Sequence, residues 1–298
     1  MGREELAQLQ TMLMYESKSL AELLKDPTLF KEMVAKAEHT KDKLSAAIFL
    51  FGVQTILTEQ QKRIAKATLI RLLMQLASQI SAKGMRSMER YLTTYRHGAD
   101  EISIEETLEN ILPKKTIDYE DIVMVDKRQK KRGVVLILDT SNSMQKEKIV
   151  IAVLAVGVLA FRLQGEYYSV ISFNTEANVL KEIDKETSIE ELLDKMLEIR
   201  PENATDIRNG LEKGLEQLSK VVANEKIGII VTDGWVTRGG DPVEVAQKFQ
   251  RLHVIQAPIG FTGWDEEMCK KMARAGRGRW IHVKTYEELP SAIMKILS

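Results

Sequence analysis

A short apolar run followed by a cluster of oxygen-bearing side chains constrains the fold of this 298-residue chain more than any other feature. Every residue from 134 to 138 is valine, leucine or isoleucine, and Asp139, Ser141 and Ser143 follow at alternate positions. A run that is this short, rich in branched side chains and closed by turn-forming residues is typical of a strand buried on both faces of a parallel sheet. We therefore predict such a strand, with one carboxylate and two hydroxyls gathered beyond its carboxyl end.

Two later segments bring further oxygen atoms to the same place. A second apolar run at 227–231 ends shortly before Asp233, and Thr205 lies in a polar loop that precedes a helical pattern. Because the carboxyl ends of parallel strands meet at one edge of a sheet, Asp233 is expected beside Asp139. Ligands that are all oxygen suit a hard divalent cation such as Mg²⁺. The sequence therefore predicts a magnesium site, although each residue taken alone is also an ordinary cap or loop residue.

The order of the remaining patterns assigns the fold class. Strand patterns at 167–173, 179–183, 253–257 and 280–283 alternate with helical patterns. This alternation predicts an α/β fold with a doubly wound, mostly parallel sheet over residues 133–298.

The amino-terminal part differs in the spacing of its apolar residues. Apolar residues recur at helical spacing through residues 1–112, and Asp26-Pro27 is a typical helix start. We predict an all-α domain there, joined by a linker at 113–132 to the sheet domain. The linker ends in a basic cluster at 127–132. Such a cluster can contact RNA or an acidic partner, but a solvated approach to the first strand is the favoured interpretation.

Five positions carry a resemblance to a known family. In order and spacing they are similar to the metal-ion-dependent adhesion site of von Willebrand factor A domains, over roughly residues 130–298: Asp139, Ser141, Ser143, Thr205 and Asp233. The resemblance implies that the three hydroxyls touch Mg²⁺, or alternatively Mn²⁺ or Ca²⁺, while the two aspartates act mostly through waters and hydrogen bonds. It also implies that an Asp or Glu of a partner protein completes the coordination. The loop at 202–204 departs from the pattern, because it lacks the glycines that relatives often have there.

The order of a helical part and an A domain resembles a narrower group, the CoxE-like proteins associated with MoxR-type AAA+ ATPases. That resemblance implies an adaptor that brings the ATPase to a client. The alternative is a Ro-like RNA-binding protein, which also joins helices to an A domain. Lys and Arg together number 43, as do Asp and Glu, so that the formal net charge is zero. Together with the absence of a helical repeat, this counts against nucleic acid as the partner.

An enzymatic function is not expected. Phosphoryl-transfer enzymes with a nucleophilic aspartate after a buried strand use a second carboxylate two residues on, and Ser141 stands there. The single cysteine, Cys269, excludes an internal disulfide and lies in an amphipathic helical pattern that predicts a packed thiol. No signal peptide or membrane-spanning run is predicted. We therefore expect a cytoplasmic, non-enzymatic protein.

Three kinds of residue near these patterns have alternative interpretations. Asp206 is favoured as the N-cap of a helix that begins at Ile207, over a role as metal ligand. Trp235 follows the second aspartate almost directly, and contact with a partner and burial under a neighbouring loop are equally good interpretations. His253 and His282 lie in strand patterns with apolar neighbours, which favours a structural role.

Overall fold

The computed structural model describes residues 3–82, 91–94, 101–114, 118–126, 132–141, 147–199, 204–257 and 265–297. The chain divides into two compact units, which are described separately below. The larger unit combines residues 1–84 with 132–298, and the smaller unit comprises residues 85–131.

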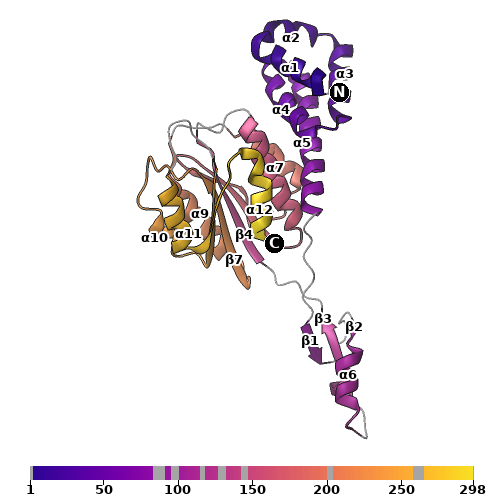
Figure 1. The fold of residues 1–298 in the computed structure, drawn as a ribbon, viewed down its shortest axis with the longest axis vertical. Coiled ribbons are helices and arrows are strands. Elements are labelled where there is room, and N and C mark those ends of the chain that lie inside the picture. The colour runs from indigo at the N-terminus through magenta and orange to yellow at the C-terminus, as the bar shows by residue number, and fades with distance from the viewer. Residues whose placement is uncertain are drawn as a thin grey trace. The chain divides into compact units, whose positions relative to one another are not determined.

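A six-stranded sheet forms the centre of the larger unit (Figure 1). Its strands, in spatial order, are β6 (Ala177–Lys181), β5 (Tyr167–Phe173), β4 (Arg132–Asp139), β7 (Glu225–Thr232), β8 (Arg251–Gln256) and β9 (Arg277–His282). All neighbouring strands run parallel except β6, which is antiparallel to β5. The predicted fold class, α/β with a mostly parallel sheet, is therefore confirmed.

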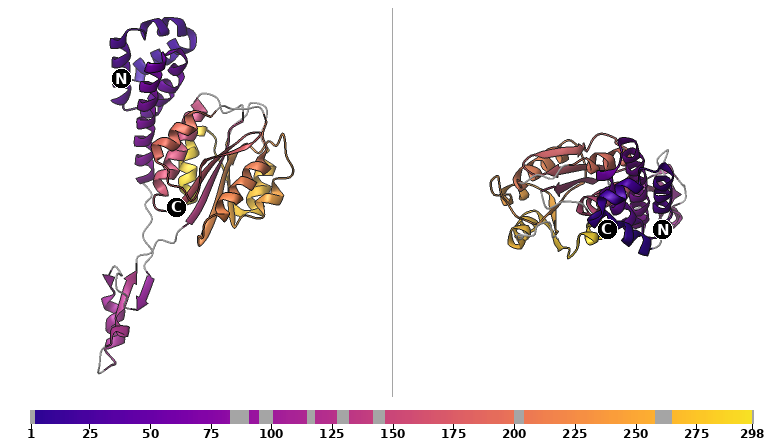
Figure 2. Two further views of the ribbon diagram at one scale, coloured as in Figure 1. Left: turned by 180° about the vertical axis from the view of Figure 1, so that it is seen from behind. Right: turned by 90° about the horizontal axis from the view of Figure 1, so that it is seen from above.

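Helices cover both faces of this sheet, as the views in Figure 2 also show. One face packs against α7 (Glu147–Arg162), α8 (Ile189–Leu197) and α12 (Leu289–Leu297). The other packs against α9 (Ile207–Ser219), α10 (Val243–Ala246) and α11 (Glu266–Ala275). Side chains along β4 alternate between the two apolar cores, since Leu136 belongs to the first and Ile137 to the second. This double burial explains why the strand reads as a continuous apolar run.

The amino-terminal residues form α1 (Arg3–Tyr15), α2 (Ser17–Leu23), α3 (Pro27–Glu38), α4 (Lys43–Val53), the short η1 (Gln54–Ile56) and α5 (Glu59–Ala82). The predicted start of α3 is confirmed, because Asp26 caps it by accepting a hydrogen bond of 2.7 Å from the backbone N–H of Thr28. None of the helices in the described part of the chain is long and apolar enough to cross a bilayer.

These helices share a core with the sheet domain. Leu69, Leu73 and Ala77 of α5 belong to the same apolar cluster as α7. Gly157 of α7 makes the contact close, because a Cβ atom there would lie 3.0 Å from the Cβ of Ala77. The structure therefore differs from the expectation of a separate helical domain. Periodicity shows which face of a helix is apolar, but not what covers that face.

The smaller unit contains strands that the sequence did not predict. They are β1 (Tyr91–Thr94), β2 (Glu101–Ile102) and β3 (Val123–Asp126), which pair antiparallel in the order β1-β3-β2 beside α6 (Ile104–Ile111) and η2 (Tyr119–Asp121). The prediction of helices alone through residue 112 and of a plain linker at 113–132 is corrected here. Strands of two to four residues are too short to show the alternation by which strands are predicted.

Candidate metal centre

The carboxyl ends of β4 and β7 bring Asp139 and its surroundings together. Ser141 donates its backbone N–H to Oδ1 of Asp139 at 3.0 Å, and the hydroxyl of Thr232 donates to Oδ2 at 2.8 Å. Thr232 is the last residue of β7, so the second bond joins the two neighbouring strands. Both carboxylate oxygens of the buried Asp139 are thus oriented by the protein.

The loop after β7 orients the second carboxylate. Asp233 accepts the backbone N–H of Trp235 at Oδ1, 2.9 Å away, and its carbonyl accepts the N–H of Asp265 at the same distance. Gly234 has a φ of +83°, and a Cβ atom there would collide with the carbonyl oxygen of Asp265. Only glycine fits both constraints. Trp235 is 53% exposed, so burial under a neighbouring loop is excluded. The other interpretation, contact of Trp235 with a partner, stays a prediction.

The electrostatics of this edge favour a bound cation. Burial, and secondly the charge of Asp233, raise the pKa of Asp139 to about 7. Burial also raises the pKa of Asp233. Lys148, in the first turn of α7, acts on Asp233 with its positive charge, although burial lowers the pKa of this lysine. Two buried carboxylates that repel each other are stabilised as anions by a divalent ion, so the donors present fit such a group.

Thr205 is held at this edge by its backbone. Its N–H donates to Oγ1 of Thr237 at 2.7 Å, and its carbonyl accepts the N–H groups of Thr237 and Arg238, each at 3.2 Å. None of these bonds uses the hydroxyl of Thr205. Asp206 accepts the N–H of Asn209 at 3.0 Å and caps α9, which confirms the favoured interpretation.

The structure thus places four of the five predicted site residues, Asp139, Ser141, Thr205 and Asp233, on segments at one edge of the sheet, and Ser143 lies outside the described residues. Within the described ranges no group of three or more His, Cys, Asp or Glu side chains is arranged to hold a metal ion. The candidate set instead combines two carboxylates with hydroxyls. Their assignment as ligands remains a prediction.

Sequence reasoning missed three residues that shape this site. Thr232 was visible as a polar residue at the end of an apolar run, directly before the aspartate. Lys148 and Thr237 gave no signal, because nothing in a sequence links them to Asp233 or Thr205. Their roles depend on which loops the fold brings together.

Several other candidates are structural. His253 is buried and accepts the backbone N–H of Arg279 at Nδ1, 3.1 Å away, and burial lowers its pKa to about 4. The structural interpretation of His253 is therefore confirmed. His282 is exposed and stacks on Trp280, with ring centroids 6.2 Å apart. Cys269 is buried, and burial raises the pKa of its thiol, so that it is the packed thiol that the sequence predicts.

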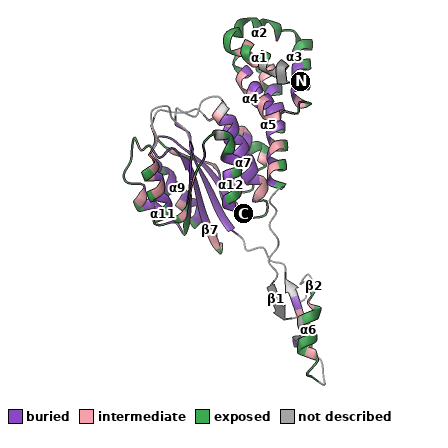
Figure 3. Cartoon of the chain, viewed as in Figure 1, coloured by how far each residue is buried: buried purple, intermediate pink, exposed green. Residues whose placement is uncertain are grey.

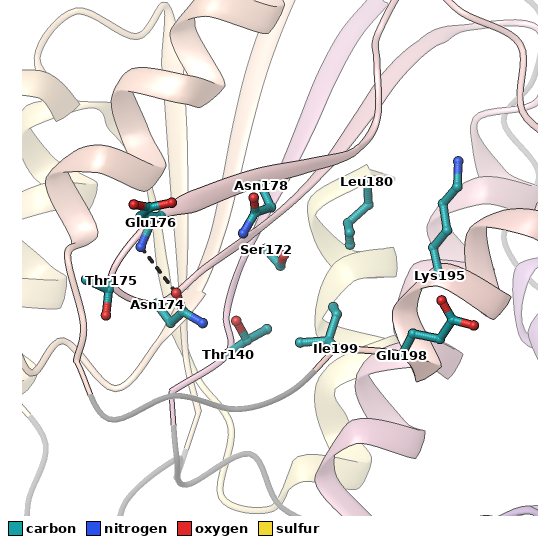
Figure 4. A pocket seen from close by; sticks show the side chains of 10 residues that line it. All are labelled: Thr140, Ser172, Asn174, Thr175, Glu176, Asn178, Leu180, Lys195, Glu198 and Ile199. Atoms are coloured by element: carbon teal, nitrogen blue, oxygen red, sulfur yellow. Dashed lines mark hydrogen bonds between the residues drawn. The ribbon is translucent and has the colours of Figure 1, made fainter.

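A polar groove of about 630 Å³ lies beside β6 and the end of α8 (Figure 4). Thr140, between Asp139 and Ser141 in the sequence, is one of its lining residues. The other lining residues come from the end of β5, the turn between β5 and β6, strand β6, and the end of α8 with the residues just after it; they include Asn174, Glu176, Asn178, Lys195 and Glu198.

The model of the von Willebrand factor type A domain family matches residues 133–295. The chain belongs to this family. No curated protein matches the chain. Solved structures similar to the A domain include an aerotolerance-related membrane protein from Bacteroides fragilis, which is 19% identical with a TM-score of 0.45. The match covers 55% of this chain and 98% of the Bacteroides fragilis chain. The conserved hypothetical protein BatB from Bacteroides thetaiotaomicron is 21% identical with a TM-score of 0.45. The match covers 55% of this chain and 96% of the BatB chain. Proximal thread matrix protein 1 from the mussel byssus, solved with zinc in its metal-ion-dependent adhesion site (MIDAS) motif, is 19% identical with a TM-score of 0.48. The match covers 56% of this chain and 47% of that protein's chain.

Proposed function

We propose that this protein is a non-enzymatic adaptor whose A domain binds a divalent cation, with Mg²⁺ as the first choice, and through it an Asp or Glu of a partner protein. The observation that carries the proposal is the pair of buried carboxylates, Asp139 and Asp233, at the ends of adjacent strands. Their pKa values are raised by burial, and for Asp139 also by the charge of its neighbour. A cation removes that repulsion, and the membership of the family supports the same conclusion.

Each residue of the site has a role in this proposal. Ser141 and Thr205, together with Ser143 beyond the described residues, hold the ion directly by their hydroxyls. Asp139 and Asp233 act through waters and hydrogen bonds, which is consistent with the bonds that already orient both oxygens of Asp139. A bound divalent ion supplies a coordination place that a carboxylate of another protein can occupy.

The described residues also support a role without catalysis. Ser141 stands where a phosphoryl-transfer enzyme would carry its second carboxylate. The thiol of Cys269 is buried with a raised pKa, which makes it a poor nucleophile. His253 uses Nδ1 to accept a backbone hydrogen bond, so that nitrogen is not open to a substrate.

A MoxR-type AAA+ ATPase is the partner that we propose, in a cytoplasmic adaptor of the CoxE-like kind. The support is the order of helices and A domain, and the shared core of α5 and α7, which ties the helices to the A domain. The RNA-binding alternative rests on the same order of helices and A domain, and the basic cluster at 127–132 is where RNA could bind; of this cluster only Arg132 lies among the described residues. Arg132 is buried and donates from Nε to Glu166 at 2.6 Å, so this arginine is not available to a phosphate backbone.

Calorimetric titration of Mg²⁺ and Mn²⁺ into the purified protein tests the proposal, together with binding of a purified MoxR-type ATPase with and without EDTA. Ser141→Ala and Thr205→Ala should each weaken metal binding, and EDTA should release the partner. Ser219→Ala is the matched control, because this exposed hydroxyl at the end of α9 bonds only locally, to the carbonyl of Glu216. Metal affinity that is unchanged in both site variants, or partner binding that EDTA does not affect, contradicts the proposal.

The carboxylate on the partner is identified by a double-mutant cycle. The partner's Asp or Glu is changed to Asn or Gln, alone and in combination with Thr205→Ala. Because both changes remove the same coordination, the two losses should be strongly non-additive. Additive losses mean that the metal and that carboxylate do not meet.

A further inference from the structure

Helix α6 of the smaller unit packs the side that carries Thr107 and Asn110 against β3 and η2. Thr107 accepts the backbone N–H of Val123 at Oγ1, 2.9 Å away, and its hydroxyl lies 3.3 Å from the carbonyl of the same residue. Asn110, one turn later, donates from Nδ2 to the carbonyl of Asp121 at 3.4 Å. These bonds fix which side of the helix faces β3 and η2. An amphipathic helix usually buries its apolar side instead.

Within the smaller unit much of α6 is exposed (Figure 3), and the exposed residues include its large apolar ones. Ile104, Leu108 and Leu112, spaced four residues apart, are 70%, 50% and 80% exposed, and they are called the α6 stripe below. Ile102 of β2 and Tyr119 of η2 are exposed in the same unit. A row of large apolar side chains on one helix face is typical of a surface that another molecule covers.

The charges beside the α6 stripe indicate what that molecule is. Glu105 and Glu109 each follow a stripe residue by one position, and both are exposed. Lys114 forms an ion pair with Asp121, so its charge is already paired. The rim of the stripe on this side is therefore acidic, which favours a partner with Lys or Arg beside its own apolar face.

The same rim disfavours two other occupants. A second copy of this chain would bring its own Glu105 and Glu109 against the first pair, and like charges repel across an interface. Helices that lie on membranes carry Lys and Arg on the polar face, because the lipid surface is anionic. An acidic rim is the opposite arrangement.

We propose that the α6 stripe is the docking surface for an amphipathic helix of a partner protein, with basic residues along the edge of its apolar face that meets Glu105 and Glu109. This binding mode places apolar anchors at helical spacing in contact with the stripe. It is independent of the metal centre, and its partner is a different protein from the one that the metal binds.

Fluorescence anisotropy with the full-length protein tests the proposal. The probe is a labelled synthetic helix with leucines on one face and lysines on the other, and the comparison probe carries glutamates in place of the lysines. The lysine probe should bind at least about tenfold more tightly than the glutamate probe, and Leu108→Ser should weaken it by about tenfold, equivalent to about 1.4 kcal/mol. Binding should persist in EDTA. Equal binding of both probes, or no effect of Leu108→Ser, overturns the proposal.

Two further variants keep the test specific. Glu109→Lys leaves the α6 stripe intact and should reduce or reverse the preference for the lysine probe. Val222→Ser is the matched control, because Val222 is 97% exposed in the other unit and should not affect the probe.

Other occupants of the stripe have their own signatures. A dimer of the free protein that Leu108→Ser dissociates shows that a second copy is the occupant. Binding to vesicles of anionic lipid that is lost in the same variant shows a membrane. A melting temperature that falls in Leu108→Ser without any probe shows that the chain covers the stripe itself. Each of these results overturns the proposed occupant.

Discussion

Asp139→Asn is expected to stabilise the metal-free protein while it abolishes metal binding. The substitution keeps the shape of the side chain and removes its charge. Burial and the charge of Asp233 raise the pKa of Asp139 from its ordinary value of 3.8 to about 7. Without metal, the folded protein therefore holds this proton more tightly than the unfolded chain. Ionisation of Asp139 then costs stability as the pH rises from about 4 to about 7.

The size of the effect follows from these two pKa values. Each pH unit between them corresponds to about 1.4 kcal/mol, so the ionised carboxylate destabilises the fold by up to about 4 kcal/mol above pH 7. Asparagine cannot accept from both Ser141 N–H and the Thr232 hydroxyl as the carboxylate does, which costs about 1 kcal/mol. The net gain at pH 8 is about 3 kcal/mol, or roughly 6 to 12 °C in Tm.

Thermal and urea unfolding in EDTA, at pH 5 and pH 8, measure this difference. The variant should be the more stable protein at pH 8, and the difference should shrink at pH 5 and reverse by up to about 1 kcal/mol below pH 4, where only the lost hydrogen bond remains. Mg²⁺ at a hundredfold excess over its Kd should stabilise the wild type by about 2.7 kcal/mol and leave the variant unchanged. If wild type and variant in EDTA show the same stability at pH 8, burial and the charge of Asp233 do not destabilise the ionised Asp139 as inferred. If Mg²⁺ stabilises both equally, Asp139 does not belong to the metal site.

Three further predictions address the surroundings of the site and the core. Thr237→Val removes the acceptor for the N–H of Thr205. It should weaken Mg²⁺ binding by about tenfold in calorimetry, since an unpaired N–H costs about 1–3 kcal/mol. Thr237→Ser should restore the affinity, and equal affinity in all three proteins counts against a positioning role of Thr237. Gly157→Leu should lower the free energy of unfolding by about 1–3 kcal/mol, because it overpacks the contact with Ala77; urea unfolding with an unchanged midpoint would show that α5 and α7 are not tightly packed. His253 has a pKa lowered to about 4, so its contribution to stability is complete above pH 6.5 and is lost as the pH falls towards 4; His253→Asn keeps an acceptor and should abolish this part of the pH dependence, which an identical pH profile would refute.

Local patterns determined the centre of this protein. Strands β4 and β7 are predictable from their apolar runs, because burial of both faces favours apolar side chains at successive positions. The caps at Asp26 and Asp206 are legible because a cap bonds within three residues of itself. The grouping of Asp139 and Asp233 follows from the rule that parallel strands end at one edge. Each of these inferences needs only neighbours in sequence or a general rule of chain topology.

The tertiary structure alone decided how distant segments meet. The apolar face of α5 is visible in the sequence, but its contact with α7 depends on the close approach at Gly157. Thr237 is an unremarked loop residue until the fold places it against Thr205, 32 positions away. The outward α6 stripe has the pattern of an ordinary buried face, and only the bonds of Thr107 to Val123 reverse it. Periodicity records which side of an element is apolar, whereas the partner of that side is fixed by packing between elements far apart in the chain.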